Sequence, residues 1–187
     1  MSENVRVDRR VRRTRFAVQS ALVHLMIERD YAAITVADIA ERADVSRSTF
    51  YLHFADKDDV LRMGAEAARD WALAVAPRDR RFGFSEPLYA HCSDMRPVFR
   101  AIAGRQSWAV MQHLFTQILG ELIRDDLKDA GDALTVDAVV RFVSGAFLSV
   151  LTWSMDNERD GDAAEMDRMF RQFVLPGVDA MLAAPTR

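Results

Sequence analysis

The side chains of this chain that are best suited to binding chemistry gather between residues 46 and 57. Hydroxyls, a guanidinium, a phenol, an imidazole and an ammonium follow one another there, with Asp56 as the one acid. Donors of this kind suit the phosphate oxygens and base edges of duplex DNA. The polar candidates in this stretch are Ser46, Arg47, Ser48, Thr49, Tyr51, His53 and Lys57.

Short helices must position these groups. Thr35 is predicted to cap a helix over residues 36–43, whose apolar residues follow helical spacing. Ser46 is predicted to cap the next helix, which ends near His53. The three-residue connection between them predicts a helix-turn-helix unit. Asp56 is predicted to open a longer helix over residues 57–75.

Two adjacent aromatics, Phe50 and Tyr51, lie on the second of these helices. Phe50 and Phe54 are four residues apart and share a face with Val45, so we expect that face to join the core. Tyr51 then points outward with Arg47. An outward tyrosine beside arginine and serine suits contacts with phosphate, sugar and thymine methyl groups.

The stretch "TVADIAERADVSRSTFYLHFADKDDVL" resembles the DNA-binding region of the TetR family of transcriptional regulators over roughly residues 12–63. The matching residues are Thr35, Ile39, Ala40, Thr49, Phe50, Tyr51, His53, Phe54, Lys57 and Leu61. The candidate DNA-binding set is therefore Thr35, Ser46, Arg47, Ser48, Thr49, Tyr51, His53 and Lys57. The family usually has glycine where Asp30 and Asp44 stand, so both are expected at turn positions with φ > 0.

Composition predicts an all-α chain of about nine helices, because glycine and proline are scarce and strand alternation is hard to find. Six arginines fall within the first 15 residues, so a basic N-terminal arm is expected to meet phosphate or to remain solvated. We assign residues 1–57 to a helix-turn-helix domain and 58–187 to a helical effector-binding and dimerisation domain. The second assignment is what the resemblance implies.

Large apolar side chains of the second domain are candidates for an effector cavity, although aromatics at helical spacing also make plain core. The predicted cavity residues are Trp71, Phe99, Trp108, Met111, His113, Phe115 and Trp153. The segment 135–155 is apolar nearly all round, which favours a dimer seam with the last helix over a monomer with a thick core. The predicted seam residues are Val143, Phe147, Val150, Met166, Phe170 and Phe173.

Other chemistry is not expected. No phosphate-binding glycine loop and no metal-ligand spacing of Cys or His occurs, so no cofactor or metal is predicted. His91 beside Cys92 could suggest catalysis or redox sensing, but adjacent helical residues point about 100° apart. One cysteine, no secretory signal and no apolar run of membrane-spanning length predict a cytoplasmic protein without membrane contact.

These features predict a ligand-responsive regulator, most simply a repressor. It would bind a pseudo-palindromic operator in double-stranded DNA as a homodimer and be released by a small hydrophobic effector. The alternatives are a constitutive sequence-specific DNA-binding protein without a ligand and a small helical enzyme.

Overall fold

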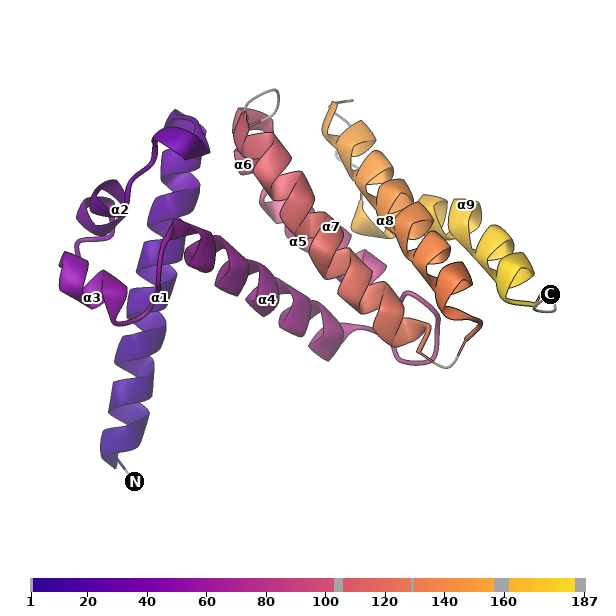
Figure 1. Cartoon of the computed structure of the whole chain (residues 1–187), viewed down its shortest axis with the longest axis horizontal. Helices are drawn as coiled ribbons and strands as arrows, with labels where there is room; N and C mark the ends of the chain where they lie inside the picture. The colour runs from indigo at the N-terminus through magenta and orange to yellow at the C-terminus, as the bar shows by residue number, and fades with distance from the viewer. Residues whose placement is uncertain (1, 103–105, 129, 157–161, 184–187) are drawn as a thin grey trace. The chain divides into compact units, whose positions relative to one another are not determined.

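The computed structural model describes residues 2–102, 106–128, 130–156 and 162–183, and those residues form helices joined by short connections (Figure 1). A single 3-10 turn, η1 (Tyr31–Ala33), precedes the helix-turn-helix. The α-helices within the described residues are α1 (Ser2–Glu28), α2 (Val36–Arg42), α3 (Arg47–Tyr51), α4 (Lys57–Val75), α5 (Ser85–Asp94), α6 (Arg96–Ile102), α7 (Gln106–Asp126), α8 (Ala133–Asp156) and α9 (Ala163–Ala183). The all-α prediction is confirmed.

The chain forms two compact units. The first contains residues 1–65 and 98–110, and the second contains residues 66–97 and 111–187. The division thus falls within α4, α6 and α7 rather than after Lys57, and the first unit also includes most of α6 and the start of α7.

In the first unit, α2 and α3 lie beside α1 (Figure 1). The core between them is built from residues that recur at helical spacing in α1 and from the apolar faces of α2 and α3. Its buried side chains include Val18, Leu22, Leu25, Met26, Ile39, Phe50 and Phe54.

Of the two aspartates expected at φ > 0, only one adopts it. Asp44, in the turn after α2, has φ 52° and therefore occupies the left-handed region. Asp30 instead has φ −63° and ψ 142°, so the prediction for that position is wrong. Asp30 stands directly before η1, where an extended residue is enough to start the tighter turn.

In the second unit, α5, α8 and α9 pack together around an aromatic cluster. The rings of Tyr89 and Phe147 stack at 4.1 Å with an interplanar angle of 11°, and Phe170 meets Phe147 edge-on at 5.7 Å. All three side chains are fully buried. Because each ring comes from a different helix, this cluster fixes which face of α8 and of α9 points inward.

The hydropathy of α8 corrects one expectation. Ala133–Met155 has a mean hydropathy of 1.7 and is long and apolar enough to cross a membrane by composition. Only part of that surface is buried within the chain. At the start of α8, Asp132 acts as the cap by accepting hydrogen bonds from the backbone N–H groups of Leu134 and Thr135.

Candidate nucleic-acid interface

Two side-chain caps define the helix-turn-helix. The Thr35 hydroxyl accepts from the backbone N–H of Asp38 at 3.2 Å, and the Asp38 carboxylate accepts from the backbone N–H of Thr35 at 2.8 Å. This reciprocal capping box fixes the first turn of α2. The Ser46 hydroxyl accepts from the backbone N–H of Thr49 at 3.0 Å and caps α3 in the same manner. Both predicted caps are confirmed.

One of the two adjacent aromatic side chains is buried and the other is exposed, as expected. Phe50 is fully buried, whereas 58% of the Tyr51 side chain is exposed. Their rings meet edge-on at 5.5 Å, so the buried ring supports the exposed one. Phe54 packs on the same inner side, with its ring centroid 5.6 Å from that of Phe50. Tyr51 therefore lies on the surface against a buried ring.

The remaining predicted DNA-binding residues lie around Tyr51. Arg47 and Ser48 are exposed, and His53 and Thr49 are partly exposed. The hydroxyls of Ser48 and Thr49 both lie 2.8 Å from that of Ser46, which forms a small hydroxyl cluster at the start of α3. The exposed surface of α3 therefore presents a guanidinium, a phenol and hydroxyls together.

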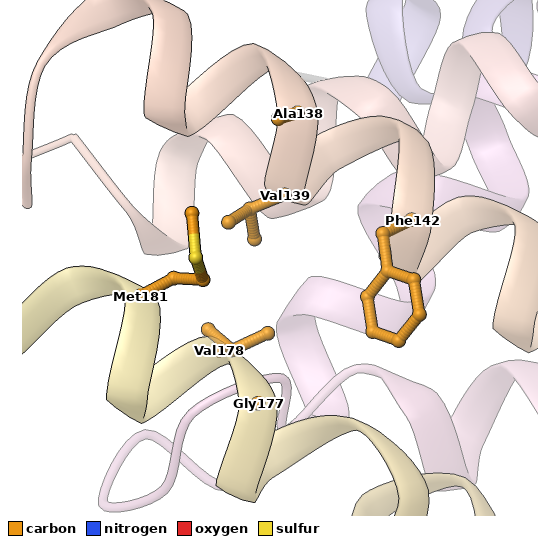
Figure 2. Close-up of a pocket in the computed structure, with 6 residues that line it drawn as sticks. All are labelled: Ala138, Val139, Phe142, Gly177, Val178 and Met181. Atoms are coloured by element: carbon orange, nitrogen blue, oxygen red, sulfur yellow. The ribbon is translucent and has the colours of Figure 1, made fainter.

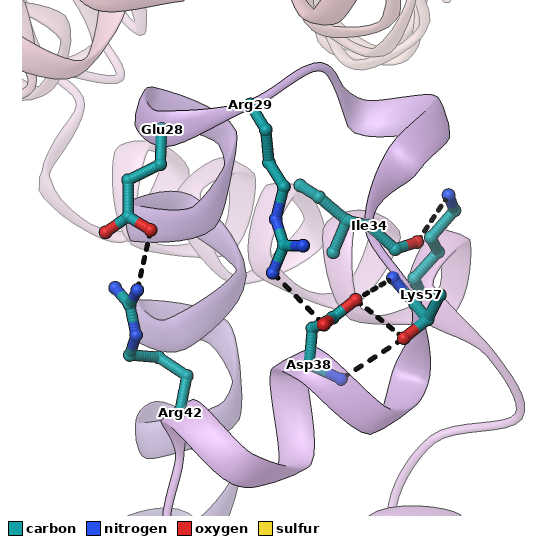
Figure 3. A network of polar contacts seen from close by, with 7 residues as sticks. Glu28, Arg29, Ile34, Asp38, Arg42 and Lys57 are labelled. Atoms are coloured by element: carbon teal, nitrogen blue, oxygen red, sulfur yellow. Dashed lines mark hydrogen bonds and ion pairs between the residues drawn. The ribbon is translucent and has the colours of Figure 1, made fainter.

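Lys57 has a different environment from the one predicted. Its ammonium donates to the backbone carbonyls of Tyr31 at 2.7 Å and Ile34 at 2.9 Å (Figure 3 shows the second bond). The same nitrogen lies 4.4 Å from the centroid of the Tyr31 ring. Lys57 therefore has only one of its three N–H donors left for the predicted phosphate contact. Lys57 ties the first turn of α4 to the turn before α2.

Two ion pairs fasten the end of α1 to α2 (Figure 3). Arg42 meets Glu28 at 2.6 Å, and Arg29 meets Asp38 at 3.2 Å. The hydrogen bond from Arg42 lowers the pKa of the Glu28 carboxyl, and the bonds from Thr35 lower that of Asp38. Asp38 thus serves the cap of α2 and the contact with α1 at once.

The N-terminal arm is helical. It forms the first turns of α1, which continues past α3 in Figure 1. Its side chains are described from residue 9 onward, and the exposed cations there are Arg9, Arg10, Arg12, Arg13 and Arg15. No Asp or Glu occurs between residues 9 and 27. This side of the first unit therefore carries a concentrated positive charge.

The predicted effector residues fall in different units. Phe99 is buried and meets Trp108 edge-on at 6.1 Å in the first unit. Trp71, in the second unit, is 44% exposed, with its ring 5.9 Å from that of His91. His113 is exposed, and Met111 and Phe115 are partly buried. Trp153 lies on the outward face of α8.

The dimer stripe predicted on α8 and α9 is wrong for four of its residues. Val143, Phe147, Met166 and Phe170 are at most 1% exposed, because their side chains enter the aromatic core of their own chain. Phe173, at 70% exposed, and partly exposed Val150 keep the predicted outward position. The apolar side chains that do face outward are Phe142, Trp153, Phe173 and Met181.

Two open hollows lie along this outward face of α8 and α9. One, of about 290 Å³, is shown in Figure 2, where Phe142, Val139, Val178 and Met181 surround it. The other, of about 420 Å³, includes Ala146, Trp153 and Phe173. Phe142 was not among the predicted seam residues, and Trp153 was predicted to line the effector cavity instead.

The side chains that suggested enzyme chemistry do not form a site. Cys92 is fully buried, and burial raises the pKa of its thiol. Burial lowers the pKa of the neighbouring His91. Within the described residues, no group of three or more His, Cys, Asp or Glu side chains is arranged to hold a metal ion.

Sequence reasoning missed Tyr31. Its side chain is 7% exposed, its hydroxyl donates to the Asp58 carboxylate, and its backbone N–H donates to the Ser107 hydroxyl at 2.9 Å. Burial raises the pKa of the Tyr31 phenol, which stays protonated and a donor. The available signal was an aromatic residue with a polar tip three residues after the end of α1.

The comparisons agree with this geometry. Residues 20–62 match the sequence model of the family described as "Bacterial regulatory proteins, tetR family". The chain is 28% identical over 179 residues to the uncharacterized HTH-type transcriptional regulator YxbF of Bacillus subtilis, covering 90% of this chain and 46% of that protein. The chain thus spans less than half the length of this relative.

Solved structures share the fold. A TetR transcriptional regulator from Streptococcus agalactiae superposes with a TM-score of 0.63 at 21% identity, covering 92% of this chain and 99% of that one. A complex of SmeT with triclosan gives a TM-score of 0.51 at 16% identity, covering 88% and 90%.

The fold contains a helix-turn-helix with an exposed α3, together with a second helical unit. Residues 20–62 thus carry the sequence pattern of the TetR family, and the chain as a whole is similar to transcriptional regulators of that fold. The proteins named here are regulators rather than enzymes.

Proposed function

We propose that this chain is a ligand-responsive transcriptional repressor that reads DNA through α3. The observation that carries the proposal is the pair of neighbouring aromatics. Phe50 is buried, and it supports Tyr51, which is exposed beside Arg47. An outward-facing phenol and a long cation on one exposed helix suit a major groove.

The start of α1 supplies the sequence-independent part of the binding. Its exposed arginines continue the positive surface beyond α3, and arginine contacts to phosphate release counterions from DNA. In this proposal Arg47 and Tyr51 select the sequence, while the arm raises affinity for any duplex. The two contributions differ in their dependence on salt.

A homodimer is the proposed binding form, with the outward face of α8 and α9 as the contact. Phe142 and Phe173 are 55% and 70% exposed on this face, and both lie beside the open hollows described above. Large exposed apolar patches on a folded chain mark interaction sites. Two copies would present two recognition helices to successive major grooves, about 34 Å apart.

The proposed effector is a small hydrophobic molecule. The second unit and the helix α7 supply apolar side chains such as Trp71, Met111 and Phe115, and few charged ones among the predicted set. One protein of similar fold was solved with triclosan, an apolar aromatic compound. The effector must bind the DNA-incompetent state more tightly, because equal affinity for both states shifts nothing. We place the regulator in the cytoplasm, where the DNA and a diffusing effector meet.

The test begins with selection of bound duplexes from a random-sequence pool by the wild-type protein. Arg47→Ala should weaken binding to the selected duplex by about 1–3 kcal/mol and flatten the preference at one base pair of each half-site. Arg168→Ala, an exposed arginine on α9, is the matched control and should change neither. Equal losses on selected and random duplexes would refute base reading by Arg47.

A panel of hydrophobic compounds then tests the response, with tryptophan fluorescence and duplex release followed in parallel. Release by one class of compound supports a regulated repressor. Sequence-specific binding that no compound alters would favour the constitutive alternative.

A further inference from the structure

Three hydrogen bonds to residues far along the chain hold Tyr31, the first residue of the turn η1. The Tyr31 hydroxyl donates to Asp58, its carbonyl accepts from Lys57 at 2.7 Å, and its backbone N–H donates to the Ser107 hydroxyl at 2.9 Å. Asp58 and Lys57 belong to the first turn of α4, whereas Ser107 belongs to the first turn of α7. One residue therefore connects the entry of the helix-turn-helix to the starts of two long helices.

The bond to Ser107 is the unusual one. Ser107 is fully buried and stands 76 residues further along the chain than Tyr31. A buried backbone N–H that loses its acceptor costs far more than an exposed one, because water cannot replace the bond. The position of Tyr31 is therefore sensitive to the position of the Ser107 hydroxyl.

Tyr31 in turn sets the position of the reading helices. Ile34, three residues later, gives its carbonyl to the same Lys57 ammonium at 2.9 Å, and Thr35 directly after it is the cap of α2. A shift of Tyr31 would disturb the two hydrogen bonds that the Lys57 ammonium donates to Tyr31 and Ile34. It would also move the segment that enters α2. The short connection leaves little slack to absorb such a shift, since consecutive Cα atoms are fixed at about 3.8 Å.

We propose that Ser107 is a positioning residue for DNA binding: through Tyr31 it couples the first turn of α7 to the orientation of α2 and α3. The proposal rests on the proposed function and adds a route to it. Displacement of α7 would reach the recognition helix through Ser107 and Tyr31, without first moving along α4. Helix α7 runs from Gln106 to Asp126, and its residues 111–126 belong to the second unit.

Thermodynamic reciprocity allows a test without knowing the effector. If α7 influences DNA binding, then DNA binding must influence α7 by the same free energy. The probe is the duplex selected by the wild-type protein, and the readout is backbone hydrogen exchange with and without it. In the wild type, we expect the duplex to slow exchange both in residues 46–54, where DNA binds, and in residues 106–118.

Ser107→Ala should separate these two responses. Residues 46–54 should still be slowed by the duplex, but residues 106–118 should lose their response. Exchange of the Tyr31 amide should accelerate by roughly 5- to 150-fold, and affinity for the selected duplex should fall by roughly tenfold, while affinity for random DNA holds. Ser144→Ala is the control, because Ser144 is equally buried on α8 and its hydroxyl has no partner among the described residues.

A second variant guards against a general loss of structure. Tyr31→Phe removes the bond to Asp58 but keeps the backbone bond to Ser107, so residues 106–118 should still respond to the duplex. The proposal is overturned if Ser107→Ala keeps the α7 response, if Tyr31→Phe abolishes it, or if the wild type shows none. Absence of protection in residues 46–54 of the wild type would instead refute DNA binding by α3.

Discussion

Replacing Phe173 by alanine should dissociate the proposed dimer without unfolding the chain. An aromatic side chain carries about 200 Å² of surface, so its 70% exposure leaves about 140 Å² for a partner to bury. At about 25 cal/mol per Å², this area corresponds to about 3.5 kcal/mol for each copy as an upper figure. A twofold contact contains the residue twice, so the upper figure doubles to about 7 kcal/mol.

The measurable effect should be smaller, because side-chain ordering and imperfect packing offset part of this free energy. We expect about half of it, which raises the dimer Kd by about two to three orders of magnitude. Sedimentation velocity over a range of protein concentrations gives this Kd directly. Loss of affinity for the selected duplex should accompany dissociation, because one half-site provides few contacts.

Phe147→Ala is the matched control, with the same change of side chain on the inner face of α8. Phe147 is fully buried in the ring cluster with Tyr89 and Phe170, so its loss should cost about 3–5 kcal/mol of unfolding free energy. Urea unfolding should register this variant strongly and Phe173→Ala weakly. A Phe173→Ala protein with the wild-type dimer Kd would show that this face is not the contact.

Three further changes test the first unit and the loop before α5. Lys57→Met should lower the unfolding free energy by about 1–3 kcal/mol in urea titrations, because two carbonyls lose a charged donor; an unchanged midpoint would restore Lys57 to a purely surface role. Asp44→Gly should raise stability by about 1 kcal/mol, since φ is 52° there, and a lower melting temperature would contradict this account. Gly83→Ala should unfold the second unit or distort it, visible as a large loss of melting temperature. Its new Cβ would lie 2.2 Å from the carbonyl oxygen of Pro77.

Local sequence signals predicted the helix-turn-helix well. The caps at Thr35 and Ser46 and the division between Phe50 and Tyr51 depend only on neighbours within four residues, which periodicity and capping rules cover. The start and end of α4, at Lys57 and Val75, followed from the same rules. These are features that a short segment determines by itself.

The errors arose where distant residues decide. Lys57 donates hydrogen bonds to two carbonyls that the turn at Tyr31 places beside it, and no spacing in the sequence predicts these bonds. Asp30 and Asp44 both resemble glycine positions of the family, yet only Asp44 adopts φ > 0, while Asp30 is extended and starts η1. Helix α8 is apolar nearly all round, so its sequence lacks the polar face that orients most helices. Tyr89, 58 residues before Phe147, decides which face of α8 is buried.

The composition of α8 leaves two candidates for its outward face, a lipid bilayer or another protein surface. Its length and mean hydropathy of 1.7 satisfy either one. The charges of its first half separate them. Asp137 and Arg141 form an ion pair at 3.2 Å, and the Arg141 side chain is 82% exposed, so a spanning helix would carry both into the hydrocarbon. A charged group at that depth costs several kcal/mol, whereas the polar rim of a protein contact accepts it readily. Together with exposed Phe142 and Phe173 further along the same face, this arrangement favours an apolar seam edged by charge. A protein surface therefore suits this face of α8 better than lipid does, which is consistent with the proposed homodimer.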